Sequence, residues 1–129
     1  MNRLWYLFAI PLCAMALACS SGPSGPEQVI QQFYSHLNDG AYSNAMSLYS
    51  SDARGIFEDS ASDGSSMFGE WARIETREGK VDRVQLLQQE ASDDGASVEF
   101  EIVYVDGTRV SRSVTLTREN GEWKLGLIS

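Results

Sequence analysis

The sequence is short of cysteine, histidine and positive charge. It has two cysteines and one histidine in 129 residues, and ten basic residues against eighteen acidic ones, for a net charge of −8. An excess of negative charge argues against nucleic acid as a partner and against electrostatic binding to anionic lipid. The apolar fraction of 43% and the length indicate one soluble globular domain.

The sequence also lacks an apolar run long enough to cross a bilayer. Its longest run, residues 4–17, is 14 residues, whereas a spanning helix needs about 20. Arg3 precedes the run, and Ala16-Leu17-Ala18-Cys19 follows it with small residues before a cysteine. This pattern predicts that residues 1–18 are a signal peptide that is removed.

The cleavage region resembles the bacterial lipobox, which implies acylation of Cys19. Cys13 is excluded as the site because Leu12 before it is too large for the cleavage position. Ser20, rather than Asp, implies sorting to the outer membrane, facing the periplasm. Residues 19–25 are then the lipidated cysteine and a flexible tether, and residues 26–129 are the folded domain.

Processing at Cys19 would leave few residues that could form a metal site or a nucleophilic catalytic site. A chain starting at Cys19 keeps nine basic and eighteen acidic residues, hence a net charge of −9. Its only cysteine is used as a thioether, so no disulfide is expected. With His36 as the only histidine, neither a zinc site nor a Cys-His or Ser-His nucleophile can be assembled. His36 is expected to be a partly exposed helical residue.

Two helices are predicted directly after the tether. The first begins at Pro26, where a missing N–H costs nothing, and ends near Asn38 before Gly40. Its apolar residues recur every three or four positions, and residues 41–50 repeat that period. Both segments should therefore bury one face.

A third helix is predicted over residues 65–78, with a strand as the alternative because Ile74 and Thr76 favour extended structure. The preceding segment, 51–66, is polar and acidic. We expect it to be a loop in which Ile56 and Phe57 fold back against the core.

The C-terminal half is predicted to be an antiparallel meander of four strands, over residues 81–91, 98–105, 108–118 and 122–128. Apolar and polar residues alternate in these strands, which is typical of a sheet with one buried face. The residues expected to face the helices are Val98, Phe100, Ile102, Tyr104, Val110, Val114, Leu116, Trp123, Leu125 and Leu127.

The Asn120-Gly121 pair predicts a two-residue hairpin loop. A change of one residue in the strand register would move every side chain to the other face of the sheet. The alternation of apolar and polar residues therefore tests the proposed loop length. The two-residue loop pairs Arg118 with Trp123 and places apolar residues opposite apolar ones in the pairs Leu116–Leu125 and Val114–Leu127.

The Asp106-Gly107 pair predicts a different turn. A two-residue loop there would put Phe100 opposite Ser113, that is, an apolar side chain opposite a hydroxyl. An odd loop with Gly107 in a bulged turn avoids this. It predicts the pairs Tyr104–Val110 and Phe100–Val114, and it leaves Arg112 as the one charge that points inward or toward the rim.

Several segments of residues 26–129 together form a recognisable pattern: Pro26-Glu27-x-Val29, Phe33-Tyr34, Leu37-x-x-Gly40-x-Tyr42-x-x-Ala45, VEFEIVYVDG and Gly121-Glu122-Trp123-Lys124-Leu125. This pattern resembles the bacterial lipoproteins of the domain-of-unknown-function 4878 family, in the nuclear-transport-factor-2-like, cystatin-like superfamily. The resemblance implies an α+β cone, with three N-terminal helices packed on a four-stranded antiparallel meander.

The superfamily includes enzymes such as ketosteroid isomerase, which need a tyrosine on the first helix and a carboxylate base after the second. Aligned through residues 37–40, the tyrosine position is Phe33, whose ring cannot donate a hydrogen bond. The base would fall among Phe57, Glu58 and Asp59, and the inward strand residues include no acid. We therefore expect no catalytic activity; the alternative is a pocket enzyme of the isomerase or dehydratase type.

A calcium loop is the one metal site with any support. Asp59, Asp63 and Glu70 fall at positions 1, 5 and 12 of an EF-hand-like pattern. Ala61 and Ser66 stand where a ligand and a packing residue are needed. An acidic, solvated loop is the preferred interpretation, and no cofactor is expected.

The remaining candidates concern binding. The aromatic side chains either line a ligand pocket or simply fill the core, which is the preferred interpretation. The candidate ligand contacts are Tyr34, Tyr104, Arg112 and Trp123. The solvent-exposed face of the sheet, here called the wet face, is a candidate protein interface. It is formed by Ser97, Glu99, Glu101, Val103 and Val105.

The sequence thus predicts a membrane-anchored lipoprotein of the bacterial cell envelope, carrying a small non-catalytic binding or protein-interaction domain. Its expected partners are the membrane, through the N-terminal lipid, and an envelope protein or small ligand whose identity the sequence does not specify.

Overall fold

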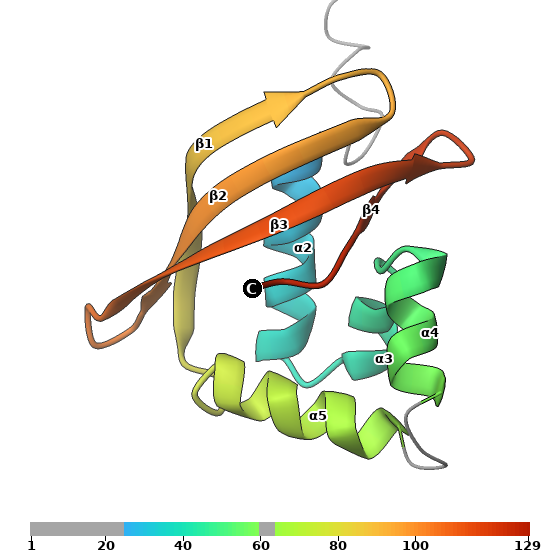
Figure 1. Ribbon diagram of the computed structural model, residues 1–129. Helices are drawn as coiled ribbons and strands as arrows, with labels where there is room; N and C mark the ends of the chain where they lie inside the picture. The colour runs from blue at the N-terminus through green and yellow to red at the C-terminus, as the bar shows by residue number, and fades with distance from the viewer. Residues whose placement is uncertain (1–24, 60–63) are drawn as a thin grey trace, which may run out of the picture.

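The computed structural model describes residues 25–59 and 64–129. Four helices come first: α2 (Pro26–Asn38), α3 (Tyr42–Met46), α4 (Ser51–Asp59) and α5 (Gly64–Glu75). A four-stranded antiparallel meander follows, in the order β1-β2-β3-β4. The sheet bends over α2, while α3, α4 and α5 gather at one end of it (Figure 1). The predicted α+β architecture, helices followed by a meander, is confirmed.

Helix α2 has the predicted bounds and lies between the sheet and the other helices (Figure 1). Pro26 is its first residue, and Glu27 places a carboxylate in the first turn, where it favours the positive end of the helix dipole. One face is buried, formed by Val29, Ile30, Phe33, Tyr34 and Leu37. In the described chain no helix is both long and apolar enough to cross a membrane.

The second predicted helix is shorter than expected, because its end pairs with the sheet instead. Helix α3 stops at Met46, and Tyr49 forms an isolated parallel bridge with Leu125. The N–H of Leu125 donates to the carbonyl of Leu48 at 2.8 Å, and the N–H of Ser50 donates to the carbonyl of Leu125 at 2.7 Å. This pairing satisfies backbone groups that a longer helix would otherwise have satisfied.

Helix α4 lies in the segment predicted to be a loop, so the expectation of three helices was wrong. Ser50 starts it: its Oγ accepts a hydrogen bond from the N–H of Ala53 at 3.2 Å, as an N-cap residue does. The ring of Phe57 stacks on that of Tyr49, with centroids 5.5 Å apart, so the predicted folding back of Phe57 is confirmed. Ile56, its predicted companion, is exposed.

The segment preferred as a helix rather than a strand is helix α5. After it, Arg77, Glu78 and Gly79 all have positive φ. Thr76 supports this left-handed turn, since its Oγ1 donates to the carbonyl of Ala72 at 2.9 Å and accepts from the N–H of Gly79 at 3.1 Å. The sharp end of the helix brings the chain directly into the sheet.

The strands are β1 (Val81–Ala91), β2 (Gly95–Tyr104), β3 (Arg109–Glu119) and β4 (Glu122–Leu125). The hairpin at Asn120-Gly121 has the predicted two-residue loop. Leu116 pairs with Leu125, and Arg118 pairs with Trp123. Positive φ at both loop residues is typical of the type I′ turn that suits twisted strands.

The hairpin at Asp106-Gly107 has the predicted odd loop, with Gly107 at a φ of +91°. The predicted pairs are wrong by two residues, because a three-residue loop closes the turn: the N–H of Tyr104 donates to the carbonyl of Thr108 at 2.9 Å. Phe100 therefore pairs with Arg112 instead of Val114. Arg112 keeps the predicted inward face.

The prediction that Leu127 faces inward was wrong, since this side chain is 45% exposed. Strand β4 ends at Leu125; the N–H of Gly126 donates to the carbonyl of Thr115, and Ser129 then pairs with Ser113. The tail contains one residue more than a regular strand would between Leu125 and Ser129. The inward and outward positions are therefore exchanged, and Ile128 packs against the core in place of Leu127.

Gly126 should tolerate no side chain, because a Cβ there would lie 2.8 Å from the carbonyl oxygen of Thr115. We expect Gly126→Ala to lower the free energy of unfolding by about 1–3 kcal/mol, measured by urea denaturation. Gly55→Ala, on helix α4 with nothing within 4 Å of the added Cβ, is the matched control. It should raise stability by about 0.5–1 kcal/mol; equal effects of the two changes would contradict this account.

Candidate functional site

The interior of the fold contains a buried carboxylate, that of Glu75 at the C-terminal end of α5. It is 5% exposed. Its Oε2 accepts hydrogen bonds from the hydroxyl of Tyr34 at 2.7 Å and from Nε of Arg112 at 2.9 Å. Its Oε1 accepts from Nη2 of Arg112, also at 2.9 Å. The two parallel bonds to one guanidinium form the bidentate geometry that makes arginine–carboxylate pairs strong.

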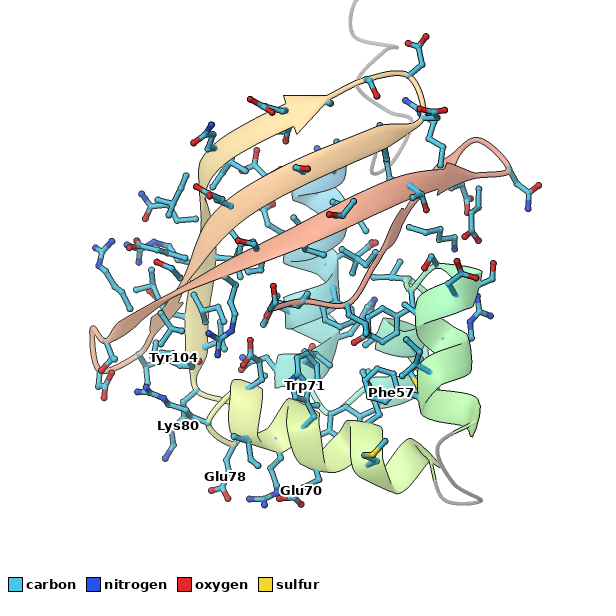
Figure 2. All side chains as sticks on the ribbon, in the orientation of Figure 1. Phe57, Glu70, Trp71, Glu78, Lys80 and Tyr104 are labelled. Carbon is cyan, nitrogen blue, oxygen red and sulfur yellow. The ribbon has the colours of Figure 1, made fainter. Side chains whose placement is uncertain are left out.

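Tyr104 joins the same cluster through the backbone. Its hydroxyl donates to the main-chain carbonyl of Glu75 at 2.6 Å, so it satisfies one of the carbonyls left free at a helix end. The guanidinium of Arg77 lies 4.0 Å from the centre of the Tyr104 ring. Figure 2 shows Tyr104 close to the C-terminal end of α5. Glu75, Tyr34, Arg112 and Tyr104 are called the Glu75 cluster below.

Four separate elements, α2, α5, β2 and β3, build the Glu75 cluster, and each is positioned by its own local pattern. Tyr34 belongs to the apolar stripe of α2, and Tyr104 and Arg112 occupy the inner face of neighbouring strands. Arg112 faces inward because the three-residue hairpin loop pairs it with Phe100, whose side chain is on the inner face of β2. Three of the four predicted ligand contacts therefore meet at one place, although they bind Glu75 of the same chain: Tyr34 and Arg112 bind its carboxylate, and Tyr104 binds its main-chain carbonyl.

Sequence reasoning missed Glu75, since the expectation that no acid points inward concerned the strands alone and Glu75 lies on a helix. The signal was the period of the preceding helix. Glu75 lies seven residues after Phe68 and three after Ala72, and both of these are fully buried. Positions three and seven residues apart share a helix face, so Glu75 had to lie on the buried one.

Burial and charge fix the protonation of the partners. Burial raises the pKa of the Tyr34 hydroxyl, and the negative charge and hydrogen bond of Glu75 raise it further. The hydrogen bonds to Glu75 raise the pKa of the Arg112 guanidinium, against the opposing effect of burial. Tyr34 therefore stays a donor and Arg112 stays charged. The carboxylate is left compensated by one cation and three hydrogen bonds.

Trp123, the fourth predicted ligand contact, lies outside the cluster. The guanidinium of Arg118 stacks on its ring at 4.4 Å, which is a cation–π contact of the hairpin itself. The other aromatic side chains pack on one another: Phe33 contacts the rings of Tyr34, Tyr49, Phe68 and Trp71. Phe57 and Trp71 come to this core from α4 and α5 (Figure 2). Core packing, the preferred interpretation, accounts for these rings.

The remaining sequence candidates do not form a site in the described chain. Cys19 and Asp63 lie outside the described residues, and so does the side chain of Asp59. Glu70 forms an exposed ion pair with Arg73 on α5. Residues 25–59 and 64–129 contain no group of three His, Cys, Asp or Glu that could hold a metal ion. His36 is partly exposed, as expected.

The wet face of the sheet is largely as predicted, except at Val103. Ser97 and Glu99 are exposed, and Glu101 forms an ion pair with Arg109 at 3.0 Å. Val103 is buried, although it belongs to the outer row. It pairs with Arg83 on one side and Arg109 on the other, and long arginine stems cover apolar neighbours of this kind.

Removing the buried carboxylate should destabilise the fold, because Arg112 and Tyr34 would lose their partner. We expect Glu75→Ala to lower the free energy of unfolding by about 3 kcal/mol, measured by chemical denaturation. Glu70→Ala on the same helix breaks an exposed pair and is the control; its effect should be much smaller. Equal effects of the two substitutions would show that burial adds nothing to the pair.

The Glu75 cluster should also make stability fall at alkaline pH. Tyrosine ionises near pH 10 in an unfolded chain, and the pKa of Tyr34 is higher in the folded protein. Its contribution is therefore complete below about pH 10 and is lost as the pH rises above that value. Tyr34→Phe should lower stability at pH 7 but make the alkaline loss shallower, by up to about 1.4 kcal/mol per pH unit.

The measurement is the free energy of unfolding from pH 8 to about pH 11.5. Tyr42→Phe is the matched control, since that ring contacts Phe68 away from the Glu75 cluster. If the free energy of unfolding falls with pH as steeply in Tyr34→Phe as in the wild type, the pKa of Tyr34 is not raised in the folded protein.

Solved structures with the same fold include the following two. One is the crystal structure of a candidate NTF2-like transpeptidase from Campylobacter jejuni, 16% identical, with a TM-score of 0.61 over 81% of this chain and 99% of that one. The other is the solution structure of a SEC-C motif-containing protein from Rhodopseudomonas palustris, 15% identical, with a TM-score of 0.61 over 91% and 87% of the two chains. At these identities the likeness concerns the fold alone.

The sequence itself leads to one family. No curated protein matches it. The domain of unknown function DUF4878 matches residues 19–126, which is most of the chain and includes every strand and helix described above. The predicted resemblance is confirmed, and the chain belongs to the DUF4878 family.

Proposed function

We propose that this protein is a lipoprotein of the bacterial cell envelope, anchored through Cys19, whose NTF2-like domain binds another envelope protein and catalyses no reaction. The proposal has three parts: an anchor, an interior that serves stability, and a binding surface on the outside of the fold.

The observation that carries the non-catalytic part is the state of Glu75. A general base must be able to accept a proton from a bound substrate. Both oxygens of Glu75 already accept hydrogen bonds from Arg112, and one also accepts from Tyr34. With both oxygens occupied by donors of the same chain, this arrangement suits an internal ion pair better than a catalytic acid or base.

The isomerase-type alternative is not favoured by the neighbouring residues. Phe33, at the position of the expected oxyanion-holding tyrosine, is packed among four aromatic rings. Tyr34 does carry a hydroxyl, but this hydroxyl donates to Glu75. The likeness to a candidate transpeptidase rests on 16% identity and supports a shared fold, not a shared reaction.

A binding role fits the outer face of the sheet. A hollow on this face is lined by polar side chains of β1, β2 and β3 together with Leu127 of the C-terminal tail. Glu99 and the exposed hydroxyls of Ser97, Ser113 and Thr115 offer hydrogen-bonding groups there. Exposed hydrogen-bonding groups beside one apolar side chain suit a protein partner, because protein interfaces combine direct hydrogen bonds with apolar contacts.

The anchor is supported by the sequence around Cys19 and by the extent of the family match. The match starts at residue 19 and leaves out the first eighteen residues, as expected if these are removed. Three acyl chains on one cysteine would hold the protein on a membrane far more firmly than a single chain, which gives only marginal binding.

Substitution of Cys19 tests the anchor. Full-length protein with Cys19→Ala, expressed in a bacterium with an outer membrane, should remain as an unprocessed precursor and lose its mature, membrane-fractionating form. Cys13→Ala is the matched control and should be processed normally, because it lies in the segment to be removed. A mature, membrane-bound band that survives Cys19→Ala would refute the proposal, and a sucrose gradient reports whether the wild type enters the outer membrane.

A further inference from the structure

Among residues 25–59 and 64–129, the sheet has one covered edge and one edge that no other segment covers. At the β4 edge, residues 48–50 bond to Leu125 and cover the strand. At the other edge lies β1, with eleven residues, none of which is fully buried. Figure 1 shows β1 as the outermost strand, beyond β2. A long open edge offers a row of backbone groups to another strand, and natural proteins usually cover it.

One residue marks where the open edge begins. The side-chain amide of Asn38 donates to the carbonyl of Val81 at 3.2 Å and accepts from the N–H of Val81 at 2.9 Å. Asn38 thus occupies both outward backbone groups of the first residue in β1, as a neighbouring strand would do. Beyond Val81 no described residue supplies such a partner along this edge.

The outward groups of β1 follow from the alternation in an antiparallel ladder. The N–H of Val105 bonds to Lys80 at the start of β1, and the N–H of Tyr104 bonds to Thr108 beside β3. Even-numbered residues of β2 therefore bond to β3, and the β1 residues opposite them direct their own N–H and C=O outward. These residues are Val84, Leu86, Gln89 and Ala91.

These four positions are symmetric about the bulge that separates Leu86 from Gln88. We propose that the open edge of β1 binds β1 of a second copy of this chain, antiparallel about a two-fold axis at residues 87 and 88. In this register Val84 faces Ala91 of the partner subunit, and Leu86 faces Gln89 of the partner subunit. Every outward backbone group of the four positions then meets its complement, and the two bulges lie opposite each other.

The side chains suit the same register. On the outer face Gln85 lies opposite Glu90 of the partner subunit. Arg83 lies diagonally from that glutamate, within reach of a long side chain. Leu87, 51% exposed in one copy, lies next to the axis, where it would be covered. Within the ladder, no two like charges face each other directly. A two-fold interface must be self-complementary in this way, whereas an unrelated peptide would need no symmetry in β1.

Cysteine pairs test the register in the purified full-length protein, oxidised in detergent with copper phenanthroline. Gln85→Cys with Glu90→Cys should give about tenfold more disulfide-linked dimer than either single variant, because facing residues of a non-hydrogen-bonded pair lie within disulfide range. Within one chain these positions are five residues apart on a strand and are too distant to bridge. The unsubstituted protein and the single variants report any link through Cys13 or Cys19.

Two further variants separate this register from others. In the double variant Arg83→Cys with Glu90→Cys, the first cysteine lies two residues from the position that faces residue 90 of the partner subunit. This displaced pair should give far less dimer than the facing pair. Gln89→Pro, added to the facing pair, removes an outward N–H that the monomer does not use, so the dimer should fall to the level of the single variants. Gln89→Ala should leave it unchanged. Circular dichroism melting shows whether the proline variant stays folded.

The proposal is overturned if the facing pair yields no more dimer than the displaced pair, or if folded Gln89→Pro protein dimerises as before. Linkage of the facing pair to a different protein in whole cells, without a self-linked dimer, would also overturn it and assign the edge to a peptide of another chain. Since the experiment uses purified protein, its outcome does not depend on whether Cys19 is acylated.

Discussion

The ion pair between Glu75 and Arg112 is the constraint on which the interior of this fold depends. A carboxylate that is 5% exposed cannot remain charged without a partner, because the cost of removing it from water is several kcal/mol. Arg112 supplies the charge, and Tyr34 supplies a further hydrogen bond. The pair therefore requires the end of α5, the middle of α2 and the inner face of β3 to meet at one point.

The same pair explains why several features next to it have the form they do. Glu75 is the last residue of α5, and the left-handed turn through Arg77 and Gly79 follows at once. Tyr104 binds the carbonyl of Glu75 while Arg77 covers the ring of Tyr104. The contacts around the carboxylate thus also end the helix and connect it to the sheet, so a change at Glu75 affects packing and chain direction together.

Under the proposed function, binding takes place on the outside of the fold. NTF2-like domains serve many purposes, and the shared fold does not specify which one applies. Here the aromatic core is packed ring against ring, and the polar groups of the Glu75 cluster bind one another. The outer face and the open edge of β1 keep unused hydrogen-bonding groups. For an anchored protein, contacts through these two surfaces would occur among neighbours held near the same membrane.

The sequence determined the features that depend on local chemistry. Pro26 started a helix, Asn120-Gly121 closed a two-residue hairpin, and alternation assigned the inner faces of β2 and β3, because each depends on residues close together in the chain. Tertiary structure decided the rest. Helix α4 formed beside Tyr49, whose own segment left its helix to pair with Leu125, and an extra residue in the tail exposed Leu127. Glu75 became the centre of the interior because its partners, Tyr34 and Arg112, lie about forty residues away on either side. Local patterns place each of these side chains on a face, but only folding brings the charges together in a region where water cannot replace the missing partner.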